Sequence, residues 1–250
     1  VVINNVLYQF WDIDSKKLAP FLTNDFIHIR KETEMVYFEK FVLNVVKNFK
    51  VRATGFGIDI AKNDPEPILS LETDLQGRPA LLLKFRYGSR VILPNIADRA
   101  FVEMQRNADD VRFVKTCRRP DSESRFAESL KTMQLQTSDV IHFYTAGMAD
   151  STPEEALYAT ITELGRLSDG LREAGFSLRQ DLGDRKYHLG NIDLQLAVKQ
   201  DNDWFDLHGM VTIGDFKIPF IALRHNISHN LREYELPAAT IAVLPEGPEP

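Results

Sequence analysis

The chain has 250 residues, of which 44% are hydrophobic and 26% charged, and its formal net charge is −6. This composition excludes a globally disordered chain, and the acidic balance excludes a protein whose whole surface is a basic coat for nucleic acid. The single cysteine, Cys117, excludes an internal disulfide and a zinc site built from several cysteines. No apolar run approaches the roughly 18 residues of a membrane-spanning helix, and no charged-then-apolar leader opens the chain, so we expect a cytoplasmic protein with no membrane partner.

The first predicted element is a helix over residues 34–49. Apolar residues recur there at a spacing of 3.6, namely Met35, Phe38, Val42, Val45 and Phe49. Val36 and Phe41 widen this apolar stripe, so we expect the helix to be buried on more than one side.

Strands and a second helix are predicted to follow. A strand is expected within 51–60, then a long hairpin of 67–75 and 79–93 around the turn Gln76-Gly77, and a helix over 122–133. The small and polar residues of Thr145–Ser151 then predict a boundary between two subdomains, 1–148 and 149–250.

The second subdomain is predicted to begin with a capped helix. Thr152 can cap it, Pro153 suits its first turn, and Glu155 completes a capping box. Gly175 is expected to end this helix.

Antiparallel strands are predicted from Tyr187 onward, because apolar and polar residues alternate there. The next strand lies in DNDWFDLHGMVTIGDFKIPF, residues 201–220, where Gly214-Asp215 fits a two-residue turn. This turn would pair Ile213 with Phe216 and Val211 with Ile218. A short helix after Pro219 and a hairpin of 231–235 and 241–244 complete a meander. The predicted fold class is therefore α+β, with mixed helix and antiparallel-sheet subdomains, the second one a helix plus a β-meander.

One side of the strand 204–213 carries Trp204, Asp206 and His208, opposite a side that includes Phe205. A carboxylate and an imidazole two positions apart could act as an orienting group and a base. The chain has no G-x-S-x-G sequence to supply a nucleophile, so a partner-binding or plain surface role outweighs catalysis.

Motifs for metal and phosphate binding are weak or missing. His225 and His229 have the spacing of a helical zinc site, but HNISH lacks the glutamate of H-E-x-x-H and no third ligand is evident. The sequence G-x-x-x-x-G-K-[ST] is absent. We therefore expect no catalytic residue, no metal ion and no cofactor in this chain.

The strongest basic feature is KFRYGSR, residues 84–90. Strand alternation would aim Lys84, Arg86 and Arg90 in one direction, as contacts with phosphates require. The alternative is an edge strand that its charges protect from aggregation. A second basic cluster, Lys115, Arg118 and Arg119, lies among acids and is nearly balanced in charge.

The C-terminal third, RKYHLGNIDLQLAV … DWFDLHGMVTIGDFKIPFIALRHNI … LREYEL … IAVLPE, resembles the bacterial Swi/Snf-family helicase-associated domain. The match includes Trp204-Phe205-Asp206, the glycine turn, an Ile-Pro and the closing Leu244-Pro245-Glu246, and looser similarity extends back to about residue 50. Two features depart from the family. Gly247 stands where a Glu-Trp normally follows, and the last turn, Pro237–Thr240, lacks the usual glycine.

The resemblance implies a non-catalytic accessory module of a Swi/Snf-type ATP-dependent DNA helicase or translocase. In that family the module lies immediately upstream of the motor, which is its expected partner and the only part expected to bind ATP and magnesium. Two hypotheses remain open for this module. One is DNA contact through Lys84, Arg86 and Arg90; the other is a protein-interaction or autoinhibitory role of the face with Trp204, Asp206 and His208, without nucleic-acid binding.

Overall fold

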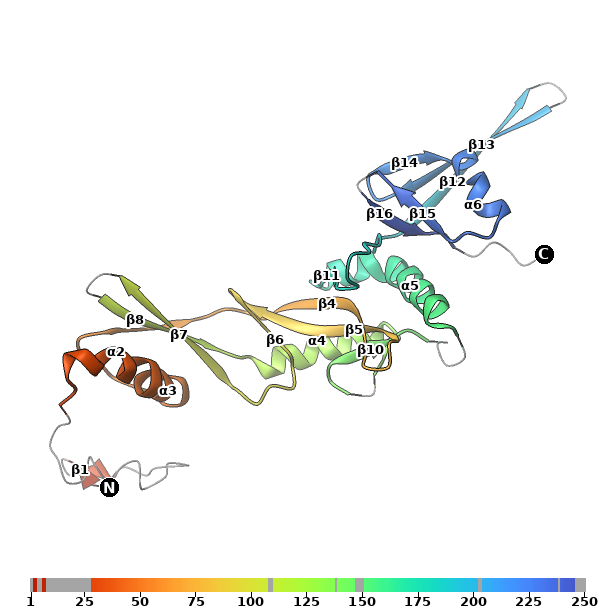
Figure 1. Cartoon of the computed structure of the whole chain (residues 1–250). Coiled ribbons are helices and arrows are strands. Elements are labelled where there is room, and N and C mark those ends of the chain that lie inside the picture. The colour runs from red at the N-terminus through yellow and green to blue at the C-terminus, as the bar shows by residue number, and fades with distance from the viewer. Residues whose placement is uncertain are drawn as a thin grey trace. The chain divides into compact units, whose positions relative to one another are not determined.

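The protein has an α+β fold, with mostly antiparallel sheets, in the computed structural model (Figure 1). The structure describes residues 28–107, 110–137, 139–146, 151–201, 204–237 and 239–245, together with the short strands β1 (Val2–Ile3) and β2 (Val6–Leu7). Residues 196–201 and 204–208 are described by their backbone, and their side chains lie outside the description. None of the described helices is long and apolar enough to span a membrane.

Contacts divide the chain into two compact units, and each unit is built from two separate stretches. Unit 1 contains Val1–Ala61 and Ala100–Lys115, and unit 2 contains Lys62–Arg99 and Thr116–Pro250. The boundaries between these units differ from the predicted boundary between 1–148 and 149–250. The division into those two subdomains stays a prediction. The physical reason is strand pairing: residues 177–180 complete a sheet that begins at residue 66, so the chain on both sides of residue 148 belongs to one unit.

Unit 1 packs one helical stretch against a three-stranded sheet. The stretch runs through Lys31–Thr33 (η1, a 3-10 turn), Glu34–Tyr37 (α2), Phe38–Val42 (η2, a π-helical turn) and Leu43–Asn48 (α3). The sheet has the order β3-β8-β7, with β3 Gly57–Ala61, β7 Ala100–Asn107 and β8 Asp110–Cys117. The core between helix and sheet is formed by Val42, Val46, Val102 and Phe113.

The predicted helix 34–49 is confirmed, but its predicted second buried side is not. Val42 and Val46 face the core, whereas Val36 and Phe41 are exposed among the described residues. The sheet contacts one face of the helix, so the wider apolar stripe is left on the surface. The hairpin of β7 and β8 was not predicted.

Unit 2 begins with a sheet of order β11-β4-β5-β10-β9, to which β6 adds by pairing with β5. Its strands are β4 Glu66–Thr73, β5 Pro79–Tyr87, β6 Arg90–Ile92, β9 Gln136–Thr137, β10 His142–Tyr144 and β11 Ser177–Gln180. The predicted hairpin of β4 and β5 is confirmed. The predicted strand 79–93 is wrong as a single strand. Gly88 adopts a φ of +60°, so the chain turns back and Arg90 pairs with Tyr87.

Two helices accompany this sheet. In α4 (Pro120–Thr132), Phe126 packs on Phe85 of β5 with ring centroids 6.1 Å apart. In α5 (Pro153–Glu173), the capping box of Thr152 and Glu155 is present as predicted. Gly175, with a φ of +90°, follows α5 and directs the chain into β11, which runs parallel to β4.

The end of the chain forms the predicted meander. It consists of β12 Ile192–Asp201, β13 Trp204–Ile213, β14 Phe216–Pro219, η3 Phe220–Leu223, α6 Arg224–Ser228, β15 Glu233–Leu236 and β16 Thr240–Val243. Gly214 has a φ of +57°, and both predicted pairs across its turn are confirmed. In the last turn Ala239 adopts a φ of +52° without the freedom that glycine has there.

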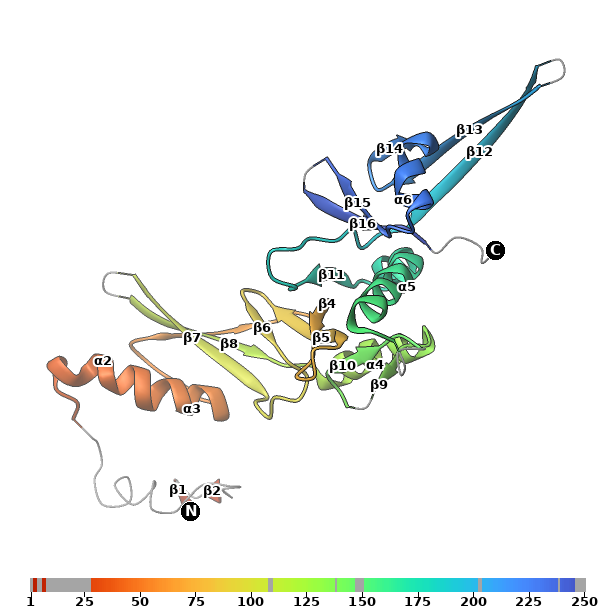
Figure 2. The same ribbon diagram turned by 45° about the vertical axis from the view of Figure 1, so that its right-hand side comes forward.

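The hairpin of β12 and β13 is longer than the sheet that contains it. The two strands pair over ten positions, from Ile192 opposite Ile213 to Asp201 opposite Trp204. The third strand, β14, pairs only with Met210–Ile213. Beyond Met210 the hairpin therefore continues as a two-stranded ribbon that extends past β14 (Figure 2). We call residues 196–201 and 204–209 the ribbon.

Candidate functional site

A group of polar side chains from three parts of unit 2 surrounds Glu233 on β15. Tyr158 of α5 donates its hydroxyl to Glu233 Oε1 at 2.8 Å and to Glu154 Oε1 at 2.7 Å. Tyr187 donates to the same Glu233 oxygen at 3.1 Å, and Arg185 forms an ion pair with Glu233 Oε2. A phenol has one hydroxyl proton, so Tyr158 serves one carboxylate at a time. The group joins the start of α5, residues 185–187 and the last hairpin.

Two guanidinium groups complete this cluster by covering the phenol rings. Arg185 lies over Tyr187 with its Cζ 5.3 Å from the ring centroid, and Arg232 lies over Tyr158 at 5.2 Å. Burial, followed by the charge of Glu233, raises the pKa of Tyr187 to about 12. Burial and hydrogen bonds to Glu154 and Glu233 raise the pKa of Tyr158 well above its ordinary value. Both phenols therefore stay protonated at neutral pH and act as hydrogen-bond donors.

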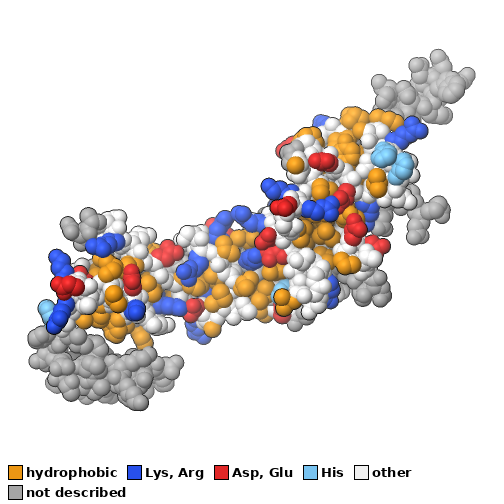
Figure 3. Space-filling model, in the orientation of Figure 1, with side chains coloured by type: hydrophobic (Ala, Val, Ile, Leu, Met, Phe, Trp, Pro, Cys, Tyr) orange, Lys and Arg blue, Asp and Glu red, His pale blue; other side chains and the backbone are white. Residues whose placement is uncertain are grey.

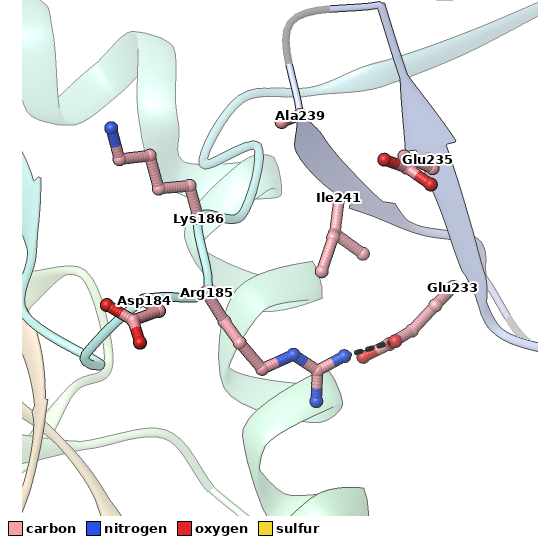
Figure 4. A pocket seen from close by; sticks show the side chains of 7 residues that line it. All are labelled: Asp184, Arg185, Lys186, Glu233, Glu235, Ala239 and Ile241. Atoms are coloured by element: carbon pink, nitrogen blue, oxygen red, sulfur yellow. Dashed lines mark hydrogen bonds and ion pairs between the residues drawn. The ribbon is translucent and has the colours of Figure 1, made fainter.

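A pocket of about 410 Å³ opens beside this cluster. It is lined by Asp184, Arg185, Lys186, Glu233, Glu235, Ala239 and Ile241. Figure 4 shows Arg185 reaching across to Glu233, while Lys186 and Asp184 point away from that pair. The pocket offers charged and hydrogen-bonding groups of both signs. Among its lining residues that the structure describes, none is a serine, threonine or cysteine.

The predicted basic row, Lys84, Arg86 and Arg90, does not form a single row. Lys84 pairs with Glu72, and Arg86 donates its Nε to Glu66 at 2.8 Å. Arg90 lies on β6 opposite Tyr87, which is the residue after Arg86 on β5. Cross-strand partners share one face, so Arg90 lies on the other face from Lys84 and Arg86. Their role in nucleic-acid contact stays a prediction, but two carboxylates neutralise most of the charge it needs.

The second basic cluster also has specific partners. Arg118 forms a buried ion pair with Glu123 of α4, the two side chains being 6% and 5% exposed. Tyr87 donates to Glu123 Oε1 at 2.6 Å, and Arg118 Nη2 donates to the carbonyl of Pro94 at 3.0 Å. Arg119 pairs with Asp64. This cluster is a structural clamp between β5, α4 and residues 94–98.

The predicted partner-binding residues Trp204, Asp206 and His208 lie on the ribbon. Their backbone belongs to β13, opposite Asp201, Lys199 and Ala197 respectively, and their side chains lie outside the described residues. Their binding role stays a prediction.

His225 of α6 and His229, which follows α6, are exposed, and their rings are 4.4 Å apart. Figure 3 shows histidine side chains (pale blue) at the surface of this part of the protein. His229 Nδ1 is 2.9 Å from the carbonyl oxygen of His225. Among the described residues no group of three His, Cys, Asp or Glu side chains is arranged to hold a metal ion. Cys117 is exposed.

The sequence analysis missed the residues around Glu233. Glu154 and Tyr158 are four apart on a helix, a spacing that could have indicated a contact. Glu233 is 75 positions from Tyr158, so it carries no local signal. Within the described residues His188 was missed as well: its Nε2 is buried without a hydrogen-bond partner, and burial lowers its pKa.

Comparison with known proteins found no relative of this chain: no family model, no curated protein and no solved structure matches it.

Proposed function

We propose that this chain is a non-catalytic accessory module of a Swi/Snf-family ATP-dependent DNA translocase, and that it docks on its motor through the ribbon. The family assignment rests on the C-terminal sequence pattern. The observation that carries the docking role is the ribbon itself, which continues an amphipathic hairpin past the strand that covers it. A cytoplasmic location is part of the same proposal.

The register supports docking because it puts the apolar residues of the ribbon in one row. Leu196 pairs with Gly209, Val198 with Leu207, and Gln200 with Phe205. Cross-strand partners share one side, so the positions of Leu196, Val198, Phe205 and Leu207 lie on the same side of the ribbon. The row begins at Ile213, which is fully buried where β14 covers the sheet. A two-stranded hairpin alone is at best marginally stable in water. A partner that covers this row would stabilise it.

The charge of the hairpin favours a protein over nucleic acid as that partner. Residues 193–208 contain four aspartates, Asp193, Asp201, Asp203 and Asp206, against one lysine, Lys199. A net charge of −3 on a projecting hairpin repels phosphates and suits an apolar protein surface with a basic rim. A protein-interaction role of the ribbon without nucleic-acid binding therefore takes precedence over DNA contact through β5. Within the ribbon the apolar row lies on the side of Phe205, opposite the predicted partner-binding residues Trp204, Asp206 and His208.

The first test is the reading frame downstream of Pro250. A phosphate loop of the form G-x-x-x-x-G-K-[ST] there supports the proposal, and its absence from the whole polypeptide refutes the family assignment.

The second test measures binding between the 250-residue chain and that motor by isothermal titration calorimetry. The double variant Phe205→Ser/Leu207→Ser should lose binding, because it interrupts the apolar row. Leu75→Ser, at a fully exposed position in the turn between β4 and β5, is the matched control and should bind like wild type. Equal affinity of all three proteins would show that the ribbon is not the docking surface.

A further inference from the structure

A second surface, in unit 1, combines positive charge with exposed aromatic rings. We call Phe41, Phe49, Lys50, Arg52 and Lys115 the helix-end surface. Unit 1 as a whole, residues 1–61 and 100–115, contains eleven Lys and Arg against ten Asp and Glu, a net charge of +1, and unit 2 carries −7. The acidic excess of the chain therefore lies in unit 2, and unit 1 is close to neutral.

The charges of unit 1 are also unevenly distributed along its helix. Glu32, Glu34 and Glu39 share the first half of the helical stretch with Lys31, whereas its second half and the residues that follow contain Lys40, Lys47, Lys50 and Arg52 and no acid before Asp59. A helix dipole favours cations in the last turn. This effect does not extend to Lys50 and Arg52, which follow the end of the helix and are exposed.

Lys115 adds a third cation to the same place from a different element. Its Nζ donates to the carbonyl oxygens of Val46 at 2.7 Å and Phe49 at 3.3 Å, so β8 holds the ammonium group at the end of α3. Within the described residues Lys50, Arg52 and Lys115 form no ion pair with a carboxylate, unlike Lys84 and Arg86. Their charge is available to an anion.

The aromatic part of the surface lies on the helix and at its end. Phe41 and Phe49 are each 40% exposed, and hydrophobic side chains are visible over α2 and α3 in Figure 3. Tyr37 stacks on Phe41 with centroids 4.9 Å apart and an interplanar angle of 21°, which fixes the orientation of that ring. Phe41 lies within the π-helical turn, and Phe49 follows the last residue of α3.

We propose that the helix-end surface binds a single strand of nucleic acid. Proteins that bind single strands combine cations along the phosphates with aromatic side chains on which the bases stack, and such binding tolerates many sequences. A duplex hides its base faces within the stack, so two exposed rings favour a single strand. Lys50, Arg52 and Lys115 contact phosphates, and Phe41 and Phe49 stack on bases. The proposal is independent of the docking role, since it concerns another unit and other residues.

The test is fluorescence anisotropy of a labelled oligodeoxythymidylate titrated with the full 250-residue chain at several salt concentrations. Wild type should bind at low salt, with a log–log salt slope of about −2 for three phosphate contacts to a single strand. Lys50→Gln/Arg52→Gln should reduce that slope by about 1.4. Phe41→Leu/Phe49→Leu keeps the apolar bulk and removes the rings, and should weaken binding about fivefold or more per ring.

Two controls separate this surface from the rest of the protein. Lys84→Gln/Arg86→Gln/Arg90→Gln removes three cations of unit 2 and should leave the affinity and the slope unchanged. The thermal unfolding midpoints of the two unit 1 variants should stay near that of wild type, because Phe41, Phe49, Lys50 and Arg52 are exposed. The unit 2 control loses two ion pairs of partly buried side chains, so its binding is measured well below its own unfolding midpoint.

Several results would overturn the proposal. Wild type that does not bind at low salt has no such site. If the leucine variant binds as tightly as wild type, the rings do not stack on bases. If wild type binds a duplex of the same length equally tightly, the surface has no preference for a single strand. Equal affinity for polyglutamate would mean a general anion surface. If the unit 2 control loses binding and the unit 1 variants keep it, the binding site lies on β5 and not on the helix-end surface.

Discussion

Removing the carboxylate of Glu123 should destabilise unit 2 more than any other single change of a charged residue discussed above. Glu123 is buried in the first turn of α4 and receives hydrogen bonds from Tyr87 at 2.6 Å and from Arg118 Nε at 3.0 Å, with a further bond from Arg118 Nη2. In Glu123→Ala the guanidinium of Arg118, 6% exposed, keeps its charge without a counter-charge. The Tyr87 hydroxyl loses its acceptor at the same time.

The expected loss of unfolding free energy is about 3–5 kcal/mol, the range found when one partner of a buried ion pair is removed. The unpaired hydroxyl belongs to the same group of contacts, so its own cost of about 1–3 kcal/mol is not simply added. For a unit of this size each kcal/mol lowers the unfolding midpoint by about 2–4 °C, so we expect a shift of about 6–20 °C.

The assay is urea and thermal unfolding, followed by circular dichroism, of wild type and a matched control. Glu128→Ala removes a carboxylate from the same helix, where it pairs with Lys131 at 2.7 Å on the surface. That variant should lose about 0.5 kcal/mol or less. Arg118→Met/Glu123→Leu removes both charges and should recover part of the loss. Recovery stays incomplete because the carbonyls of Pro94 and Asp98 lose the donor that Arg118 supplies.

Equal destabilisation by Glu123→Ala and Glu128→Ala would refute this reasoning. It would mean that water reaches Arg118 once the carboxylate is gone, so that the buried charge costs little.

The remaining predictions concern the turn, the buried histidine and the motor. Gly214→Val should cost about 1–3 kcal/mol, because Gly214 has a φ of +57° and an added Cβ would lie 3.0 Å from the His188 ring; urea unfolding without loss would contradict this. Burial lowers the pKa of His188 below its ordinary 6.5, so its contribution to stability is complete above about pH 6.5 and is lost as the pH falls through the lowered value. Unfolding at about pH 7.5 and 5 should show this loss, and His188→Gln should reduce it. The purified chain should not hydrolyse ATP with or without duplex DNA, and DNA-stimulated turnover would disprove this. In a polypeptide that includes the motor, Trp204→Ala should change the ATPase rate without unfolding this chain; an unchanged rate would exclude Trp204 from docking.

Local signals predicted several elements well. The capping box of Thr152 and Glu155 specifies a helix start through its own hydrogen bonds, and Gly214 specifies a turn that fixes the register of both strands. Such features depend on residues within a few positions of each other. The α+β class followed from them.

Long-range pairing could not be predicted in the same way. The parallel partner of β4 is β11, and nothing in the sequence near Ile68 identifies Ser177 as its neighbour. The burial of one helix side in unit 1 likewise depends on the β7 and β8 strands, which the alternation did not reveal.

The candidate sites show the same limit. Lys84 and Arg86 lie on one face of β5 as predicted, yet their partners Glu72 and Glu66 come from the neighbouring strand. The turn at Gly88 then puts Arg90 on the other face. The sequence shows where cations occur along the chain. Which of them have a carboxylate partner can be seen only in the folded structure.

The parallel pairing of β4 with β11 has a consequence for synthesis of the protein in the cell. Ile68 and Ser177 are paired neighbours, although 109 positions separate them along the chain (177 minus 68). At about 5–20 residues per second, a ribosome needs about 5–20 s to add that stretch. During this interval one edge of β4 has no strand to receive its hydrogen bonds. Nascent chains are then substrates for chaperones, and the yield of folded protein should depend on how well cells shield this edge until Gln180 has emerged.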